Sequence, residues 1–372
     1  MKKVNGHELI QLFESWSPKS FALDEDPIGL QIGQLNRAVT QVLVTLDVTP
    51  EVVQEAIDKK CELIIAHHPP IFRPLKSLRT DTFAGKIAEL CIKNDITVYA
   101  AHTNLDVAQG GVNDLLAEAL QLQNIEILEE TYSEKLMKLA VFVPESHSEM
   151  LREALASAGA GQIGNYDSCS FSTSGEGRFQ PLNGANPTIG QRNRLETVNE
   201  VKIEVVFPSS RESKIVKAMK ENHPYEEVAF DIWLLETKTN VQGIGRIGVL
   251  SEKMELESFA KLVKERLSVP FVRMVGDSKT FVHKVAVLGG DGNSYIHKAK
   301  RAGADVFVTG DMYFHIAQDA LAAGLSIVDP GHHVESIMKK GVSEKMNELC
   351  ISKNFECTFI PSSISTEPFQ II

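Results

Sequence analysis

Strand-like and helix-like segments alternate in the first and in the last third of this chain, and few folds accommodate that order. In both regions, apolar runs of strand length stand between amphipathic segments of helical length. The predicted strands are residues 41–46, 63–66, 96–100, 285–288, 305–309 and 326–328. The predicted helices are residues 4–16, 50–60, 82–93, 294–302 and 313–323. Strands that are connected by crossover helices predict an α/β fold with a parallel or mixed sheet.

The first and last thirds also resemble each other in the spacing of their polar residues. Asp47 follows a strand and His67 lies 20 residues later, while Asp291 follows a strand and Asp311 lies 20 residues later. Each region then runs through a helix and a strand into a polar cluster. We therefore predict an outer domain that is built from a duplicated βαβ unit.

The middle of the chain follows a different plan. Segments that begin at Leu139 and Ile203 each have the pattern of a strand ending in proline, a helix and a further strand, the first of which is expected at residues 168–172. Two βαβ units in tandem predict a ferredoxin-like α+β insert. Glycine, asparagine, serine and proline crowd residues 174–190, which indicates a mobile loop. The predicted domains are residues 1–126 and 241–372 for the outer domain and 127–240 for the insert.

Charge and cysteine usage exclude some classes of function. The 372 residues have a net charge of −11, which disfavours binding to a nucleic-acid backbone. Five scattered cysteines without CxxC spacing are typical of a reducing compartment. The sequence has no signal-peptide pattern at its start and no apolar run of about 20 residues. We therefore expect a cytoplasmic protein that does not enter a membrane.

The motif AHHPP carries the strongest chemical signal. His67 and His68 directly follow a buried strand, at the edge where open α/β sheets bind ligands. Adjacent histidines near a strand end tend to point apart, so that each can serve a different metal ion. The alternative is a pair of surface histidines in the loop before Pro69.

Two further polar clusters follow predicted strands. In AAHTNLD, Asp106 or His102 could join the same site, and the alternative for Asp106 is a turn or cap residue. In DPGHHVES, His332 and Glu335 are three residues apart and so share one helical face, with a cap motif as the alternative.

Together the three clusters predict a metal centre. Imidazoles and carboxylates without thiolates suit zinc, manganese or iron. Five ligands are too many for one catalytic zinc, but they fit two divalent ions with a bridging carboxylate, as in metal-dependent hydrolases. The predicted metal ligands are His67, His68, Asp106, His332 and Glu335.

Two other motifs have less specific meanings. In GDMYFH, Asp311 and His315 could form an acid/base pair or hold the metal ligands, or they could be an N-cap aspartate and an exposed histidine. Residues 243–248, GIGRIG, match GxGxxG by letter, but apolar residues continue through Val249 and Leu250. That context predicts a strand and argues against a dinucleotide-binding loop.

The segments DPIGLQIG, IIAHHPPIF, AHTNLD, TGDMYFH and GHHVES, in this order, resemble the NIF-three-like family, also called GTP cyclohydrolase 1 type 2 homologs. The segments GRFQPLNGANPTIG and HPYEEVAFDI are similar to the PII- or CutA-like insert of the longer bacterial members. The resemblance therefore covers essentially the whole chain. It implies two divalent ions on the five ligands named above. Many members space the last histidine and glutamate four apart, whereas this chain spaces them three apart, with His333 as a less suitable substitute for His332.

The resemblance also implies an assembly and an activity. It implies a homohexameric ring whose metal sites face an internal cavity, and zinc is the first choice for the ions. It implies a GTP cyclohydrolase-like hydrolase acting on a nucleotide or another small molecule. In such an enzyme we expect His315 or His102 to transfer protons. The alternative is a non-enzymatic metal carrier or regulator whose insert senses a small ligand. Of the functions considered, a ring that binds nucleic acid is the least compatible with the negative net charge.

Overall fold

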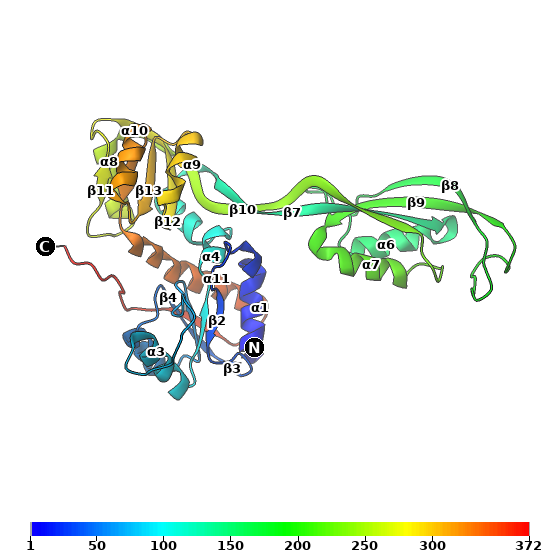
Figure 1. Cartoon of the computed structure of the whole chain (residues 1–372), viewed down its shortest axis with the longest axis horizontal. Coiled ribbons are helices and arrows are strands. Elements are labelled where there is room, and N and C mark those ends of the chain that lie inside the picture. Colours follow the sequence, from blue (N-terminus) through cyan, green and yellow to red (C-terminus); the bar gives the residue numbers. More distant parts are fainter. Residues whose placement is uncertain (1, 372) are drawn as a thin grey trace. The chain divides into compact units, whose positions relative to one another are not determined.

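The computed structural model describes residues 2–371 and divides the chain into two compact units (Figure 1). The outer domain spans Met1–Tyr132 and Gln242–Ile372, and the insert spans Ser133–Val241. Our sequence boundaries, after residues 126 and 240, lie close to these positions.

A five-stranded sheet in the order β15-β4-β5-β6-β2 forms the N-terminal half of the outer domain. Strands β4 (Gln41–Thr45), β5 (Leu63–Ala66) and β6 (Thr97–Ala100) are parallel, and helices α2 (Pro50–Asp58) and α3 (Phe83–Lys93) connect them. β15 (Thr358–Pro361) extends the parallel set beside β4, and β2 (Gly29–Ile32) is antiparallel to β6. Strands β5 and β6 are buried along their whole length, which explains their continuous apolar sequences. The predicted mixed sheet is confirmed.

The C-terminal half repeats this arrangement. Strands β12 (Phe281–Asp291), β13 (Val306–Gly310) and β14 (Ser326–Asp329) are parallel, and α9 (Ile296–Arg301) and α10 (Phe314–Ala322) connect them (Figure 1). Two antiparallel strands flank them: β10 (Phe230–Glu255) beside β12 and β11 (Arg273–Val275) beside β14. Each half thus contains three parallel strands connected by two helices.

One hydrophobic core joins the two halves of the outer domain. It contains Leu63 and Phe359 from the first sheet, Val308 from the second, and the buried faces of three helices. These helices are α1 (Gly6–Trp16), α8 (Leu256–Arg266) and α11 (Met338–Ser352). We predicted that the first helix begins at residue 4, but Val4–Asn5 form the short strand β1 with β3 (Ala38–Val39), and Asn5 caps α1. The shared core fixes the position of the two strand edges relative to each other.

The insert has the element order βαββαβ that the sequence predicts. Its elements are β7 (Gln123–Pro144), α6 (Ser148–Ala158), β8 (Phe171–Phe179), β9 (Glu196–Pro208), α7 (Glu212–Glu221) and β10. The strand order is β10-β7-β9-β8, with β9 antiparallel to both of its mapped neighbours β7 and β8. Both helices bury apolar side chains, such as Leu155 and Ile215, against Ile203 of β9. This arrangement is that of a split βαβ, or ferredoxin-like, domain.

One sequence prediction about the strands was wrong, and another was confirmed. Residues 174–179, predicted as part of a mobile loop, instead continue β8, where they pair with residues 196–201 of β9. The prediction was wrong there because β8 is an edge strand, in which glycines such as Gly175 and Gly177 are tolerated. The GIGRIG segment lies inside β10, as predicted. Within residues 2–371, no helix is long and apolar enough to cross a membrane.

Candidate metal centre

Six potential ligand side chains meet where the parallel strands of the two sheets end. His67 and His68 follow β5, and His102 follows β6 at the start of α4 (Thr103–Val107), which contains Asp106. The other two side chains belong to the 3-10 helix η5 (His332–Ile337), which follows β14. Among the described residues, ligand atoms within 4.8 Å of one another form three groups: His67–His68–His102, His68–His332–Glu335 and His67–Asp106–Glu335.

Glu335 connects these groups because its two carboxylate oxygens face different imidazoles. Oε2 lies 3.0 Å from Nε2 of His68 and 3.1 Å from Nε2 of His332. Oε1 lies 3.8 Å from Nε2 of His67. Side chains three residues apart are eclipsed in a 3-10 helix, so the local helix type explains why His332 and Glu335 meet despite their short spacing. One carboxylate therefore faces two adjacent positions that suit a cation.

A pair of buried acceptors marks the first of these positions. His67 is completely buried, and its Nδ1 donates to the backbone oxygen of Ala101 at 2.9 Å. In the neutral ring, Nε2 therefore carries a lone pair, which faces Oδ1 of Asp106 at 3.5 Å. Neither atom has a hydrogen-bond partner among the described residues. Buried acceptors that face each other are unfavourable unless a proton or a cation lies between them, so these residues fit a divalent ion.

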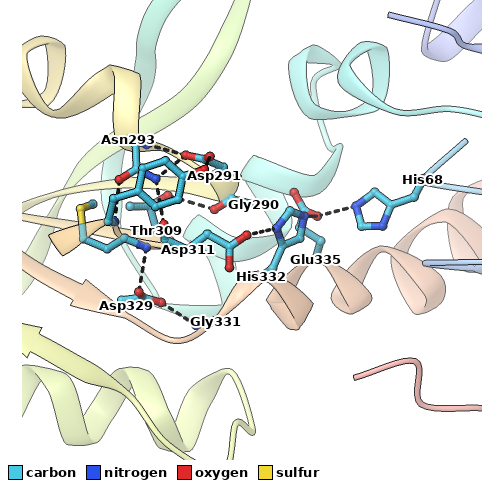
Figure 2. A network of polar contacts seen from close by, with 12 residues as sticks. His68, Gly290, Asp291, Asn293, Thr309, Asp311, Asp329, Gly331, His332 and Glu335 are labelled. Carbon is cyan, nitrogen blue, oxygen red and sulfur yellow. Dashed lines mark hydrogen bonds and ion pairs between the residues drawn. The ribbon is translucent and has the colours of Figure 1, made fainter. Parts of the chain in front are cut away.

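Three aspartates contact the Nδ1 atoms of the other three imidazoles. The Nδ1···Oδ pairs are His68–Asp47 at 2.6 Å, His332–Asp311 at 2.7 Å and His102–Asp26 at 2.9 Å. Figure 2 shows the continuous contacts from Asp311 through His332 and Glu335 to His68. A carboxylate on Nδ1 fixes the tautomer that offers Nε2 as a ligand. The imidazoles are thus oriented as they are in metal sites.

The backbone at Asp311 is itself held in an unusual conformation. Its φ of 51° lies in the left-handed region, which non-glycine residues rarely adopt. Nδ2 of Asn293 donates to the Asp311 carbonyl at 2.8 Å, and the Met312 amide donates to Asp329 at 3.0 Å (Figure 2). These contacts keep the Asp311 carboxylate beside His332, where it supports a potential ligand.

The charges of the cluster depend strongly on one another. Burial disfavours the charged form of Glu335, but contacts with three imidazoles outweigh this effect and hold its pKa well below the usual value. Burial likewise disfavours charged His68, but hydrogen bonds to Asp47 and Glu335 raise its pKa to about 10. The contact with Glu335 raises the pKa of His332 to about 9, and burial raises that of Asp106 to about 6. The site therefore stabilises positive charge, whether protons or metal ions carry it.

A cavity of about 830 Å³ opens beside the cluster within the outer domain. His68 and His332 form part of its wall, and so do the apolar side chains of Phe83 and Phe271 and the guanidinium of Arg273. The last residues of the chain, from Thr366 to Ile371, form another part of the wall. A cavity of this size next to potential ligands leaves room for a small-molecule substrate.

The structure brings all five predicted metal ligands together, and it adds His102, which we predicted as a proton carrier. It does not bring His315 to them: its Nδ1 lies 3.3 Å from Gln318 on the exposed side of α10, and His315 belongs to none of the ligand groups of the described residues. Sequence reasoning did not assign roles to Asp26 and Asp47. Asp26 belongs to the motif DPIGLQIG. The comparison of the two repeats paired Asp47 with Asp291, but the residue that contacts a histidine in the second repeat, as Asp47 does in the first, is Asp311.

Comparisons with known proteins agree over the full chain. The family model described as Duf34/NIF3 (NGG1p interacting factor 3) matches residues 4–368. A Bacillus subtilis protein named GTP cyclohydrolase 1 type 2 homolog is 56% identical over 371 residues, which cover 100% of both chains. The crystal structure of a Bacillus cereus protein related to NIF3 has a TM-score of 0.93 at 54% identity, and that of a Staphylococcus aureus protein has 0.85 at 34% identity. Both structures cover 100% of this chain and are covered to 100% by it.

Proposed function

This chain belongs to the Duf34/NIF3 family, and from that membership we propose that it is a hydrolase that depends on two divalent metal ions. The observation that carries the proposal is the placement of Glu335, whose two oxygens face separate sets of imidazoles. A carboxylate in this position is typical of a bridging ligand between two ions.

The contacts suggest how the ligands divide between the two ions. His67, Asp106 and Oε1 of Glu335 would hold one ion, because the unmatched acceptors lie there. His68, His332 and Oε2 of Glu335 would hold the other. Zinc is the first choice for this mixture of nitrogen and oxygen donors, and manganese or iron also suits it.

The remaining residues would prepare the substrate and move protons. Two divalent ions at this position would supply Lewis-acid polarisation and activation of water. His102 lies within the cluster, and Asp26 holds its Nδ1, so its Nε2 is available either as a further ligand or for proton transfer. The relatives' name supports a nucleotide such as GTP as the substrate, and the apolar side chains of Phe83 and Phe271 in the cavity would accept a flat ring. We also propose, from the family resemblance, a homohexameric ring.

Hydrolysis by metal-loaded protein tests the proposal. Protein loaded with zinc, manganese or iron should hold close to two ions per chain by mass spectrometry of metals. It should hydrolyse at least one member of a panel of nucleotides and phosphoesters, and His67→Ala should abolish that activity. Two bound ions without any turnover would favour a non-enzymatic metal carrier. Failure to bind metal would reject both the hydrolase and the carrier.

A further inference from the structure

A second cavity, of about 550 Å³, lies within the insert and far along the sequence from the metal ligands. Residues of β7, β8 and β9 line it, together with the loop that follows β8 and the segment at residues 225–229. Nothing in the metal centre uses these residues.

Hydrogen bonds hold the walls of this cavity in place. In the loop after β8, Thr188 donates through Oγ1 to the carbonyl of Pro224 at 2.6 Å, and the Asn186 amide donates to Oε1 of Glu226 at 2.7 Å. The Asn193 amide closes the same loop onto the Pro181 carbonyl at 2.6 Å. The loop is therefore tied to the opposite wall, and the cavity is formed before any ligand binds.

The charged side chains around the cavity are mostly acidic. Four glutamates and one arginine line it, which gives a net charge of −3: Glu176, Glu200, Glu226, Glu227 and Arg178. Arg178 is paired with Glu176 on the same strand at 2.7 Å, so that it does not offset the other three. The Glu200 carboxylate lies over Gly177, where a Cβ atom would come within 2.2 Å of Oε2. The missing side chain at position 177 thus makes the space that Glu200 occupies.

The rest of the lining is apolar and aromatic. The rings of Phe179 and Tyr225 meet edge to face with centroids 5.6 Å apart, and Phe142 adds a third ring to the wall. Leu182 and Ile189 add aliphatic surface. Aromatic faces attract cations, and aliphatic surface favours methylene groups, but neither offers ligands to a bare metal ion.

We propose that this cavity binds a linear aliphatic polyamine, a chain of methylene groups that carries two or three ammonium groups. The three uncompensated carboxylates match the charge of a triamine. The aromatic and aliphatic lining matches its carbon chain, whereas an inorganic cation would make no favourable contact with that lining. This site would make the insert a polyamine-responsive unit, and it is independent of what the metal centre hydrolyses.

Titration of the full chain with spermidine tests the proposal. By isothermal titration calorimetry, spermidine should bind one site per chain, and Glu200→Gln should weaken binding about tenfold or more, because a charged hydrogen bond is lost. Glu153→Gln, which removes an exposed glutamate of α6 outside the cavity, should bind spermidine like the wild type.

Three results would overturn the proposal. One is no detectable spermidine binding by the wild type. A second is unchanged binding by a Glu200→Gln protein whose circular dichroism is native. The third is equal displacement of spermidine by Mg²⁺ at the same concentration, which would show a simple patch of carboxylates. A neutral diol of similar length should give no binding and serves as the negative ligand.

Discussion

Replacing Asp106 by asparagine should stabilise the protein while removing a metal ligand. Asp106 is buried, and burial raises its pKa from 3.8 to about 6, although the charge of His67 opposes this rise. A rise of this size means that ionised Asp106 destabilises the folded state by about 3 kcal/mol. Asparagine has nearly the same shape and no charge, and so it avoids this cost.

The pH dependence of the effect follows from proton linkage. Between pH 3.8 and about 6, the folded protein retains a proton on Asp106 that the unfolded chain has released. The free energy of unfolding of the wild type therefore falls as pH rises through this window, relative to the variant. In chelator, Asp106→Asn should equal the wild type below about pH 4 and exceed it by about 3 kcal/mol above pH 6.

Urea unfolding in excess chelator, followed by circular dichroism at several pH values from 4 to 8, measures this difference. Asp319→Asn, at an exposed position of α10, is the matched control and should follow the wild type at every pH. With zinc present the order should reverse, because only the wild type gains the free energy of metal binding. A stability difference that does not change between pH 4 and 6, or a less stable variant in chelator, would refute the reasoning.

Four further changes have expected outcomes. Glu335→Gln should lower the metal content at both positions, as measured by metal analysis, because it removes charge from the carboxylate that both share. Asp47→Asn should weaken metal affinity about 10- to 100-fold in a competition with a chelating dye, since it releases the ring of His68. His315→Ala should keep the metal content of the wild type, and a loss of metal would place His315 in the site. Burial raises the pKa of Glu55, but hydrogen bonds from Lys59, Ser362 and Ser363 outweigh this effect and lower the pKa to about 2. Glu55→Gln should therefore reduce the free energy of unfolding by about 3 kcal/mol at pH 7. The wild type should lose this stability as pH falls from 4.5 towards 2, which urea unfolding at both ends of that range would detect.

Local sequence was sufficient for the elements that place the site. β5 begins and ends where its apolar run does, and α2 and α3 begin within one residue of their predicted starts, where Thr49 and Thr82 cap them. Since parallel strands direct their carboxyl ends to one edge, the clusters after β5 and β6 could be expected to meet there. β14 belongs to the second sheet, and the shared core that brings its end to the same place is a contact between distant segments.

Contacts between distant segments were beyond this reasoning. The aspartates that hold the imidazoles come from loops, and nothing in the sequence around Asp26 says that it lies beside His102. The edge strand β8 has glycines where a typical strand has β-branched residues, so that its pairing with β9 decides its structure. Nor does the short run of β15 reveal that it lies beside β4, at the other end of the chain.

That last pairing has a consequence for how the protein is made. β4 is synthesised more than 300 residues before β15, an interval of about tens of seconds on a ribosome. During this time one edge of β4 lacks its partner, which is a condition that favours association with other chains. His332 and Glu335 also emerge only near the end of synthesis. A nascent or prematurely terminated chain therefore presents His67 and His68 without the carboxylate that unites the site, and complete metal capture belongs to the finished chain alone.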